Sequence, residues 1–305
     1  FGIVDSRGDI KATTAIKTQG YGDNVEAYVD ASVEALKIII DQVGGIDKIK
    51  AMGIGAPNGN YYNGTIEFAP NLEWGRKGVV PLAKLFSDKL GIPVALTNDA
   101  NAAAIGEMTY GVARGMKNFI VITLGTGVGS GIVINGQLVY GCDGFAGELG
   151  HVIVKENGRQ CGCGRKGCLE TYCSATGVAR SAREFLENSD EPSLLRELDP
   201  EKITSYDVAM AAGKGDKIAN EIFEFTGKIL GEACANFAAF SSPEAFIFFG
   251  GLTKAGDLIM NPIKKAYDET VLNIFKGKAK FLVSGLEGSS AAVLGASAVG
   301  WDIQK

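Results

Sequence analysis

The spacing of apolar residues predicts strands and helices that alternate along the first third of the chain. Alternating apolar and polar residues around a turn at Gly8 predict a hairpin over residues 1–18. Apolar residues recurring every three or four positions predict a helix over 24–43, which ends at Gly44-Gly45. We predict next a short buried strand over 51–57, an irregular stretch over 63–74, a helix over 80–90, a buried strand over 92–99 and an alanine-rich helix over 100–110.

The rest of the chain repeats this plan on a larger scale. Residues 119–141 read as strand, glycine-rich turn, strand, Asn-Gly turn and strand. We then predict helices over 177–188, 216–240 and 258–275, strands over 245–252 and 279–285, and a small-residue helix over 289–299, with a polar stretch leading to 206–212. Two halves, each a mixed sheet flanked by helices, predict an α/β protein with a cleft between two domains, where ligands tend to bind.

The composition is that of an ordinary folded protein. A chain of 305 residues suits two domains, and 46% hydrophobic with 21% charged residues is typical of globular proteins. The net charge of −5 argues against nucleic acid or an anionic membrane as the main partner. We find no signal-peptide pattern, and the longest apolar stretch, over 233–249, is interrupted by Ser-Ser-Pro-Glu. We therefore expect a cytoplasmic protein.

Three of the six cysteines follow the only histidine within eighteen residues. The spacing H-x9-C-x-C-x4-C places His151 ahead of Cys161, Cys163 and Cys168, and interleaved glycines let the backbone fold back so that the sulfurs can converge. Three cysteines and one histidine are a closed ligand set for structural zinc. Reduced thiols beside an unrelated histidine, or a small disulfide loop, are the alternatives, and a reducing cytosol disfavours the disulfide. The remaining cysteines, which we expect to be reduced and partly buried, are Cys142, Cys173 and Cys234.

Two glycine-rich segments follow buried strands. LGTGVGSG, residues 124–131, is followed by a strand, whereas a dinucleotide fingerprint or a P-loop requires a helix there. This segment is therefore a tight hairpin whose amides and Thr126 hydroxyl could hold a phosphate, or else a turn without a ligand. Gly250-Gly251 suits the close approach of a flat adenosine, or simply ends its strand.

Polar residues also mark the junction between the buried strand over 92–99 and the helix that follows. Asn98 or Asp99 is a good N-terminal cap for that helix, and Asp99 could alternatively act as a general base toward a hydroxyl group. Glu107 within the same helix is expected to be solvated or to pair along the helix. Glu148, in GELGH, and Glu170 flank the zinc segment and could be held by it in a fixed geometry.

Several of these motifs, in this order, resemble the ROK family of sugar kinases, and most of all its glucokinases. They are GAPN and NLEW, TNDANAAAIGE, LGTGVGSGIVINGQLVYG, GELGH and CGCGRKGCLE. The resemblance covers nearly the whole chain. It implies the actin-like, hexokinase-type (ribonuclease H-like) fold, with two α/β domains closing over sugar and nucleotide. The expected domains are residues 1–97 with a C-terminal helix over about 289–305, and residues 98–288 with the zinc segment 151–168.

The resemblance also assigns roles to individual residues. It implies phosphoryl transfer from ATP with Mg²⁺, most readily to glucose, as a step of carbohydrate metabolism (glycolysis), with Asp99 as the catalytic base that also contacts the sugar. Further sugar ligands would be Asn71, Asn98, Glu148, His151 and Glu170, with His151 binding zinc through its other ring nitrogen. Thr126, Gly127 and Gly129 would face the ATP phosphates, and Gly251 the adenosine.

The chain departs from the family pattern at its start. The family opens with a strand and a DxGGT phosphate loop, and neither is present before Phe1. Phe1 lies inside a predicted strand and is not preceded by methionine, so we expect further residues ahead of it. Alternatives within the family are a kinase for N-acetylmannosamine or fructose, and a sugar-sensing transcriptional regulator, although no helix-turn-helix segment or basic surface is evident. We expect a homodimer or a dimer of dimers.

Overall fold

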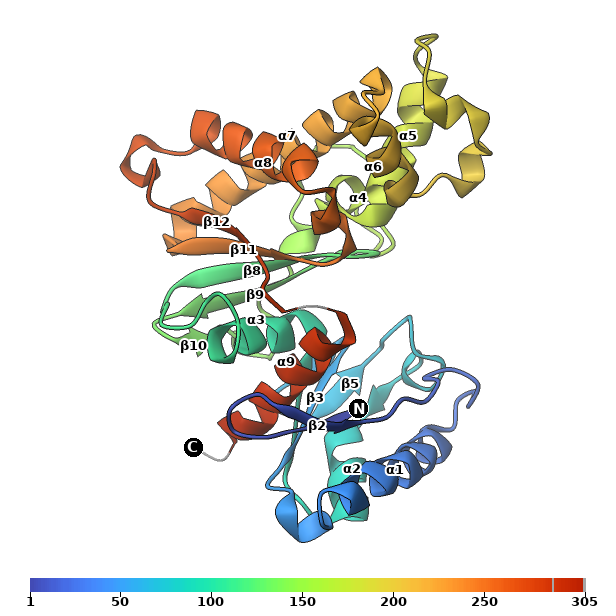
Figure 1. The fold of residues 1–305 in the computed structure, drawn as a ribbon, viewed down its shortest axis with the longest axis vertical. Coiled ribbons are helices and arrows are strands. Elements are labelled where there is room, and N and C mark those ends of the chain that lie inside the picture. The colour runs from blue at the N-terminus through green and yellow to red at the C-terminus, as the bar shows by residue number, and fades with distance from the viewer. Residues whose placement is uncertain (287, 304–305) are drawn as a thin grey trace. The chain divides into compact units, whose positions relative to one another are not determined.

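The computed structural model describes residues 1–286 and 288–303, which fall into two compact units (Figure 1). Unit 1 comprises Phe1–Met116, Gln137–Gly147 and Ser284–Lys305, and unit 2 comprises Lys117–Gly136 and Glu148–Val283. The α/β class predicted from the sequence is confirmed. Of the C-terminal helix expected over 289–305, residues 304–305 lie outside the described residues. Within the described residues, no helix combines the length and apolar character that a membrane crossing needs.

Unit 1 is built from short strands and four helices within the described residues. In chain order they are β1 (Gly2–Val4), β2 (Ile10–Thr13), α1 (Val25–Gln42), β3 (Met52–Ala56), β4 (Gly59–Asn60), β5 (Thr65–Glu67), β6 (Val79–Val80), α2 (Leu82–Leu90), β7 (Val94–Asn98), α3 (Asp99–Thr109), β10 (Gln137–Leu138) and α9 (Gly288–Asp302). β1 pairs antiparallel with β2, β3 pairs parallel with β7, and β4, β5 and β6 form a third small sheet.

Helix α1 shows how the sequence pattern produces the packing of unit 1. The Asn24 side chain caps the helix by accepting the N–H of Ala27, and the apolar stripe is buried at Val29, Val33 and Ile40. The predicted hairpin and the helices α1, α2 and α3 are confirmed. The irregular stretch predicted over 63–74 is wrong in part, because β5 lies within it. Strands of two or three residues are too short to produce a recognisable alternation.

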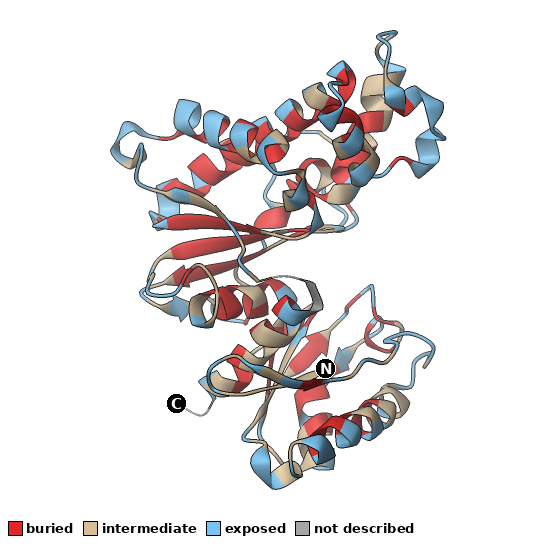
Figure 2. Ribbon diagram, viewed as in Figure 1, coloured by how far each residue is buried: buried red, intermediate tan, exposed pale blue. Residues whose placement is uncertain are grey.

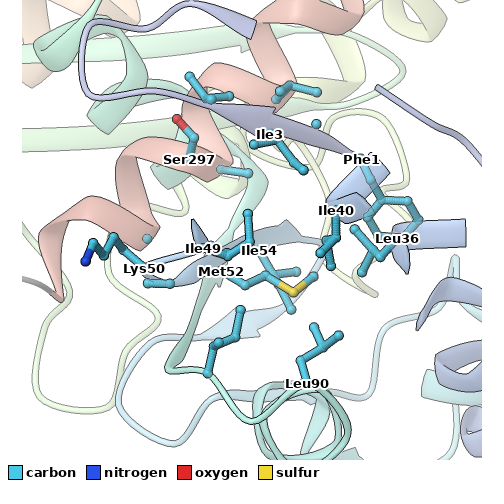
Figure 3. Close-up of a pocket in the computed structure, with 18 of the residues that line it drawn as sticks. Phe1, Ile3, Leu36, Ile40, Ile49, Lys50, Met52, Ile54, Leu90 and Ser297 are labelled. Carbon is cyan, nitrogen blue, oxygen red and sulfur yellow. The ribbon is translucent and has the colours of Figure 1, made fainter. Parts of the chain in front are cut away.

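An apolar cavity of about 550 Å³ lies between the β1–β2 pair and the β3–β7 pair (Figure 3). Ile3 of β1 and Met52 and Ile54 of β3 line it, together with Leu36 and Ile40 of α1. Among the described residues, β1 pairs only with β2, and β3 pairs only with β7. Each strand therefore has one edge without a backbone partner. The strand predicted as buried over 51–57 is only half-buried, because one side of β3 lines this cavity.

Unit 2 contains a twisted sheet covered by long helices. In chain order its elements are β8 (Phe119–Leu124), β9 (Val128–Ile134), α4 (Glu170–Cys173), α5 (Ala175–Glu187), α6 (Ser205–Gly213), α7 (Lys217–Ser241), β11 (Ala245–Phe249), α8 (Asp257–Thr270) and β12 (Lys280–Val283). β9, β8, β11 and β12 are neighbours in that order; β9 is antiparallel to β8, and the other pairs are parallel. Figure 2 shows β8 and β11 buried along almost their whole length, as their continuous apolar runs require.

Helices α7 and α8 pack closely together in unit 2 (Figure 1). Gly227 and Gly231 of α7 make this approach possible, since a Cβ at Gly227 would stand 2.3 Å from Pro262 and one at Gly231 would stand 2.3 Å from the Ile263 oxygen. The helices and strands predicted for this part of the chain are confirmed, with ends shifted by a few residues. One predicted helix, over 258–275, ends as α8 at Thr270.

Candidate functional site

The structure brings the single histidine and the three neighbouring cysteines together in unit 2. One ligand atom from each of His151, Cys161, Cys163 and Cys168 lies within 4.8 Å of the others. The Cys161 Sγ atom is 3.7 Å from His151 Nδ1, and the Cys163 and Cys168 sulfurs are also 3.7 Å apart. Tetrahedral zinc with Zn–S bonds of about 2.3 Å separates two sulfurs by about 3.8 Å. The four residues therefore fit a zinc ion in size and in ligand type, and no disulfide links them.

Local backbone geometry builds this cluster. The loop folds back on itself through bridges between Ile153 and Cys168 and between Gln160 and Lys166. Gly167 has φ of 80°, and a Cβ there would stand 1.7 Å from the Lys155 oxygen. Only glycine fits that position, because both the conformation and the contact exclude a side chain.

The ionisation of Cys161 bears on metal binding. Burial raises the pKa of this thiol, and its hydrogen bond to the Glu170 carboxylate, 3.0 Å away, also raises the pKa. Zinc binds the thiolate, so loading the site must release the Cys161 proton.

Glu170 lies between the candidate zinc ligands and the glycine-rich turn. It opens α4, directly after Leu169 and Cys168, and its Oε1 atom is 3.7 Å from His151 Nδ1. Its Oε2 atom faces the turn, where a Cβ at Gly127 would stand 2.7 Å away. Two hydrogen bonds join the turn to the start of α5: Ala175 N–H to the Gly125 oxygen at 2.8 Å, and Thr176 Oγ1 to the Thr126 oxygen at 2.7 Å.

The other predicted ligands of unit 2 lie around these elements. Glu148 directly precedes the short helix Leu149–His151, and its Oε2 atom is 4.0 Å from His151 Nε2. His151 thus directs Nδ1 to the cysteines and Nε2 to the side on which Glu148 lies. Gly129 donates its N–H to Thr123 Oγ1 at 3.1 Å, which closes the glycine-rich turn between β8 and β9.

Gly250 and Gly251 end β11 beside the end of β8. Gly250 has φ of 113°, and a Cβ there would stand 2.5 Å from the Leu124 oxygen. A Cβ at Gly251 would meet nothing within 4 Å. The close approach is therefore made by Gly250 to the neighbouring strand, while Gly251 faces open space. The glycine-rich turn and Gly250-Gly251 follow the carboxyl ends of the parallel strands β8 and β11, where α/β proteins bind ligands.

Asn98 and Asp99 lie in unit 1, at the junction of β7 and α3. Asn98 is the cap of α3, and its side chain accepts the Ala100 N–H at 2.8 Å. Asp99 accepts the same N–H through Oδ1, and burial raises the pKa of its carboxyl group above the usual value. A raised pKa suits a group that must take up a proton near neutral pH. Asn71, also in unit 1, is exposed, and its backbone oxygen accepts from the Gln19 side chain at 2.6 Å.

Two expectations about single residues differ from the structure, and one buried residue was not predicted. Glu107 is not solvated: it is 1% exposed, and its carboxylate accepts the Val112 N–H at 2.8 Å and the Ser284 hydroxyl. Cys142 is exposed and not partly buried. Arg159, which the sequence did not single out, is buried within the zinc segment. Sequence reasoning missed its burial because the neighbouring residues are mostly polar or glycine and show no apolar pattern.

Comparisons with known proteins place these motifs in one family. The family model described as "ROK family" matches residues 1–302. A glucokinase of Halalkalibacterium halodurans is 39% identical over 83% of this chain and 76% of its own length. A glucokinase of Streptomyces coelicolor is 35% identical over 97% of this chain and 92% of its own length.

Solved structures agree. A ROK family glucokinase from Streptomyces griseus, in complex with glucose and AMPPNP, has 33% identity and a TM-score of 0.79, covering 97% of this chain and 94% of that one.

A xylose repressor of Bacillus spizizenii is also similar in sequence, at 31% identity over 81% of this chain, but over only 60% of its own length. The fold is thus the actin-like α/β fold of ROK proteins, and the chain belongs to the ROK family.

Proposed function

We propose that this protein transfers the γ-phosphoryl group of ATP to the 6-hydroxyl of an aldohexose, with glucose as the preferred acceptor and glucose 6-phosphate as the product. The observation that carries the proposal is the full-length similarity to glucokinases, among them one whose structure holds glucose and an ATP analogue. The motif residues discussed above lie within the matched region.

Asp99 is proposed as the base that accepts the proton of the attacking hydroxyl. Its burial, which raises the pKa of the carboxyl, and its place at the start of α3 support this role. The turn around Thr126, Gly127 and Gly129 is proposed to hold the ATP phosphates through its amides, and Gly251 to face the adenosine. Positioning and electrostatics would supply most of the catalysis, with Mg²⁺ neutralising phosphate charge.

The sugar is proposed to hydrogen bond with Asn71, Asn98, Glu148, His151 and Glu170. Carboxylates in such a site reject analogues that lack a hydroxyl, because the carboxylate is then left without a donor. Zinc, held by His151 and the three cysteines, has no open ligand position and would supply structural rigidity rather than chemistry. Zinc would hold His151 in place as one of its ligands, and it would hold Glu170 in place through Cys168, two residues earlier in the chain.

We also propose that unit 1 contains a further β-strand between β1 and β3, which carries the DxGGT phosphate loop of the family. Among the described residues, β1 and β3 each have one unpaired edge beside the apolar cavity of about 550 Å³, which supports this placement. A strand inserted there would join the two small sheets into one. A protein extended ahead of Phe1 should melt at a higher temperature and turn over ATP faster than a chain beginning at Phe1; equal values would count against this strand.

The similarity to xylose repressors favours a second candidate, a sensor that binds sugar without turnover. The deciding experiment measures ATP consumption with glucose, N-acetylmannosamine, fructose, xylose or no sugar, using the protein extended ahead of Phe1. Turnover with one hexose that Asp99→Ala abolishes would support the kinase. Sugar-dependent thermal stabilisation without any turnover would replace it with the sensor.

A further inference from the structure

Arg159 carries a buried charge within the zinc segment, residues 151–168. It lies two residues ahead of Cys161, yet its side chain is only 5% exposed. Burying a guanidinium is costly unless every donor finds an acceptor. The acceptors that surround the guanidinium group therefore show which segments Arg159 links.

All five N–H donors of this guanidinium group are used. Nε and Nη2 donate to the Glu184 carboxylate, and Nη2 also donates to Ser181 Oγ at 2.9 Å. Nη1 donates to the Thr171 oxygen at 2.7 Å and to the Gly177 oxygen at 3.3 Å. These acceptors belong to α4 and α5, so one side chain ties the zinc segment to both helices.

The contact with α4 continues beyond these hydrogen bonds. The guanidinium carbon lies 4.5 Å from the centre of the Tyr172 ring, and the Tyr172 hydroxyl accepts the backbone N–H of Arg159 at 2.9 Å. Although burial opposes the shift, Arg159 and then Arg180 lower the pKa of Glu184 below its usual value. The Glu184 carboxylate is therefore ionised at neutral pH, as pairing with two arginines requires.

Glu170 stands between two anchors. Before it in the chain is Cys168, a candidate zinc ligand. After it is Thr171, whose carbonyl oxygen accepts a hydrogen bond from Nη1 of Arg159. The Glu170 backbone oxygen in turn accepts the Ser174 hydroxyl, which fixes the turn into α5. Zinc alone would secure only one side of this residue.

We propose that Arg159 is a positioning residue for Glu170: it fixes the Thr171 carbonyl and α5 so that the Glu170 carboxylate is held ready for a sugar hydroxyl. The role in sugar binding rests on the proposed function. Lysine cannot replace arginine here, because an ammonium group has three donors and no planar fork to reach four acceptor residues.

A double-mutant cycle tests this role on the protein extended ahead of Phe1. The dissociation constant for glucose is measured by calorimetry in the unmodified protein, Arg159→Lys, Glu170→Gln and the double variant, with zinc content and melting temperature recorded for each. Arg159→Lys should retain one zinc and weaken glucose binding about tenfold. In the Glu170→Gln background the same substitution should change the dissociation constant less than about twofold, since coupled residues are not additive.

Arg180→Lys is the matched control. Arg180 donates to the other oxygen of Glu184 at 2.9 Å but its side chain is 40% exposed, and glucose binding should be unchanged in this variant. The positioning role would be overturned if Arg159→Lys weakened glucose binding equally in the unmodified protein and in the Glu170→Gln variant. It would also be overturned if Arg159→Lys retained zinc and bound glucose as tightly as the unmodified protein.

If Arg159→Lys loses zinc or does not fold, Glu184→Gln takes its place in the same cycle. This variant keeps one amide oxygen that can accept from Arg159, and it replaces the charge and the second oxygen, which accepts from Arg180, by an NH2 group. Unchanged glucose binding in Glu184→Gln would equally overturn the proposal. Failure of the unmodified protein to bind any hexose would instead refute the proposed function, and with it this role in sugar binding.

Discussion

The Glu170 carboxylate and the Gly127 backbone lie against each other in unit 2, so closely that a Cβ at Gly127 would stand 2.7 Å from Glu170 Oε2. Real Cβ atoms do not come that near to a neighbouring atom. The approach joins the glycine-rich turn, proposed to hold phosphate, to the helix that carries a proposed sugar ligand. A side chain at residue 127 would therefore displace the Glu170 carboxylate, although the backbone angle of Gly127 does not itself require glycine.

Gly127→Ala should displace the Glu170 carboxylate and weaken glucose binding about tenfold, by the loss of one hydrogen bond to a charged group. The melting temperature should change little, because the atom that must move is the end of a flexible side chain. Calorimetry with glucose alone measures the effect. Gly125→Ala, two residues away, is the control, since a Cβ there meets nothing within 4 Å. Equal glucose binding in both variants would show that Glu170 is not a sugar ligand.

Asp99→Asn should lower turnover roughly 10²- to 10⁴-fold, the usual contribution of a general base, and leave glucose affinity nearly intact. In the unmodified protein, kcat/KM should fall as the pH drops through the raised pKa of Asp99. Steady-state kinetics between pH 5 and 9 would measure both effects; normal turnover in Asp99→Asn would remove Asp99 from the mechanism.

The same substitution should raise stability at neutral pH. Because burial raises the folded-state pKa of Asp99 above that of the unfolded chain, the ionised carboxylate costs free energy at every pH above the folded pKa. The cost disappears as the pH falls through that pKa toward the ordinary one. Asp99→Asn should therefore melt at a higher temperature than the unmodified protein at pH 8, with a smaller difference at pH 4.5. A lower melting temperature at pH 8 would contradict the burial cost.

Cys163→Ser should abolish binding of one zinc ion per chain and lower the melting temperature by about 10 °C, because structural zinc is coupled to folding. Metal analysis and thermal unfolding are the measurements. Cys142→Ser is the control: Cys142 is exposed and lies outside the cluster, so zinc content and melting temperature should stay the same. Zinc affinity should also fall as the pH is lowered, since the ion must displace the Cys161 proton. Unmodified protein that purifies without zinc, and takes up none, would refute the metal site.

Glu107→Ala should destabilise the protein by about 3 kcal/mol, because it leaves the Val112 N–H and the Ser284 hydroxyl without their buried acceptor. Urea unfolding at neutral pH measures the change. Glu34→Ala is the control, since the Glu34 side chain is 72% exposed and forms an exposed ion pair with Lys37, and such pairs contribute little. A similar small effect in both variants would mean that the Glu107 carboxylate is not a structural acceptor.

Elements with long periodic patterns could be predicted from the sequence, as α1 and β8 show. The α1 stripe repeats over five turns and its cap, Asn24, is local, so no distant residue is needed to define it. β8 is recognised by its unbroken apolar run. The two-residue strands β4 and β6 were missed, because they exist only through their pairing with β5.

The cluster of His151 with three cysteines, and a helix cap at Asn98 or Asp99, could be predicted from the sequence alone, because each depends on residues that lie close together along the chain. The burial of Glu107, the contacts of Arg159 with α4 and α5, and the close approach of the Glu170 carboxylate to Gly127 are visible only in the folded structure. Each of these depends on a partner between 12 and 177 residues away, brought close by the packing of other elements. The periodicity of a segment shows which of its faces is buried, but not which distant residues that face contacts. Those contacts depend on how whole helices and sheets pack together.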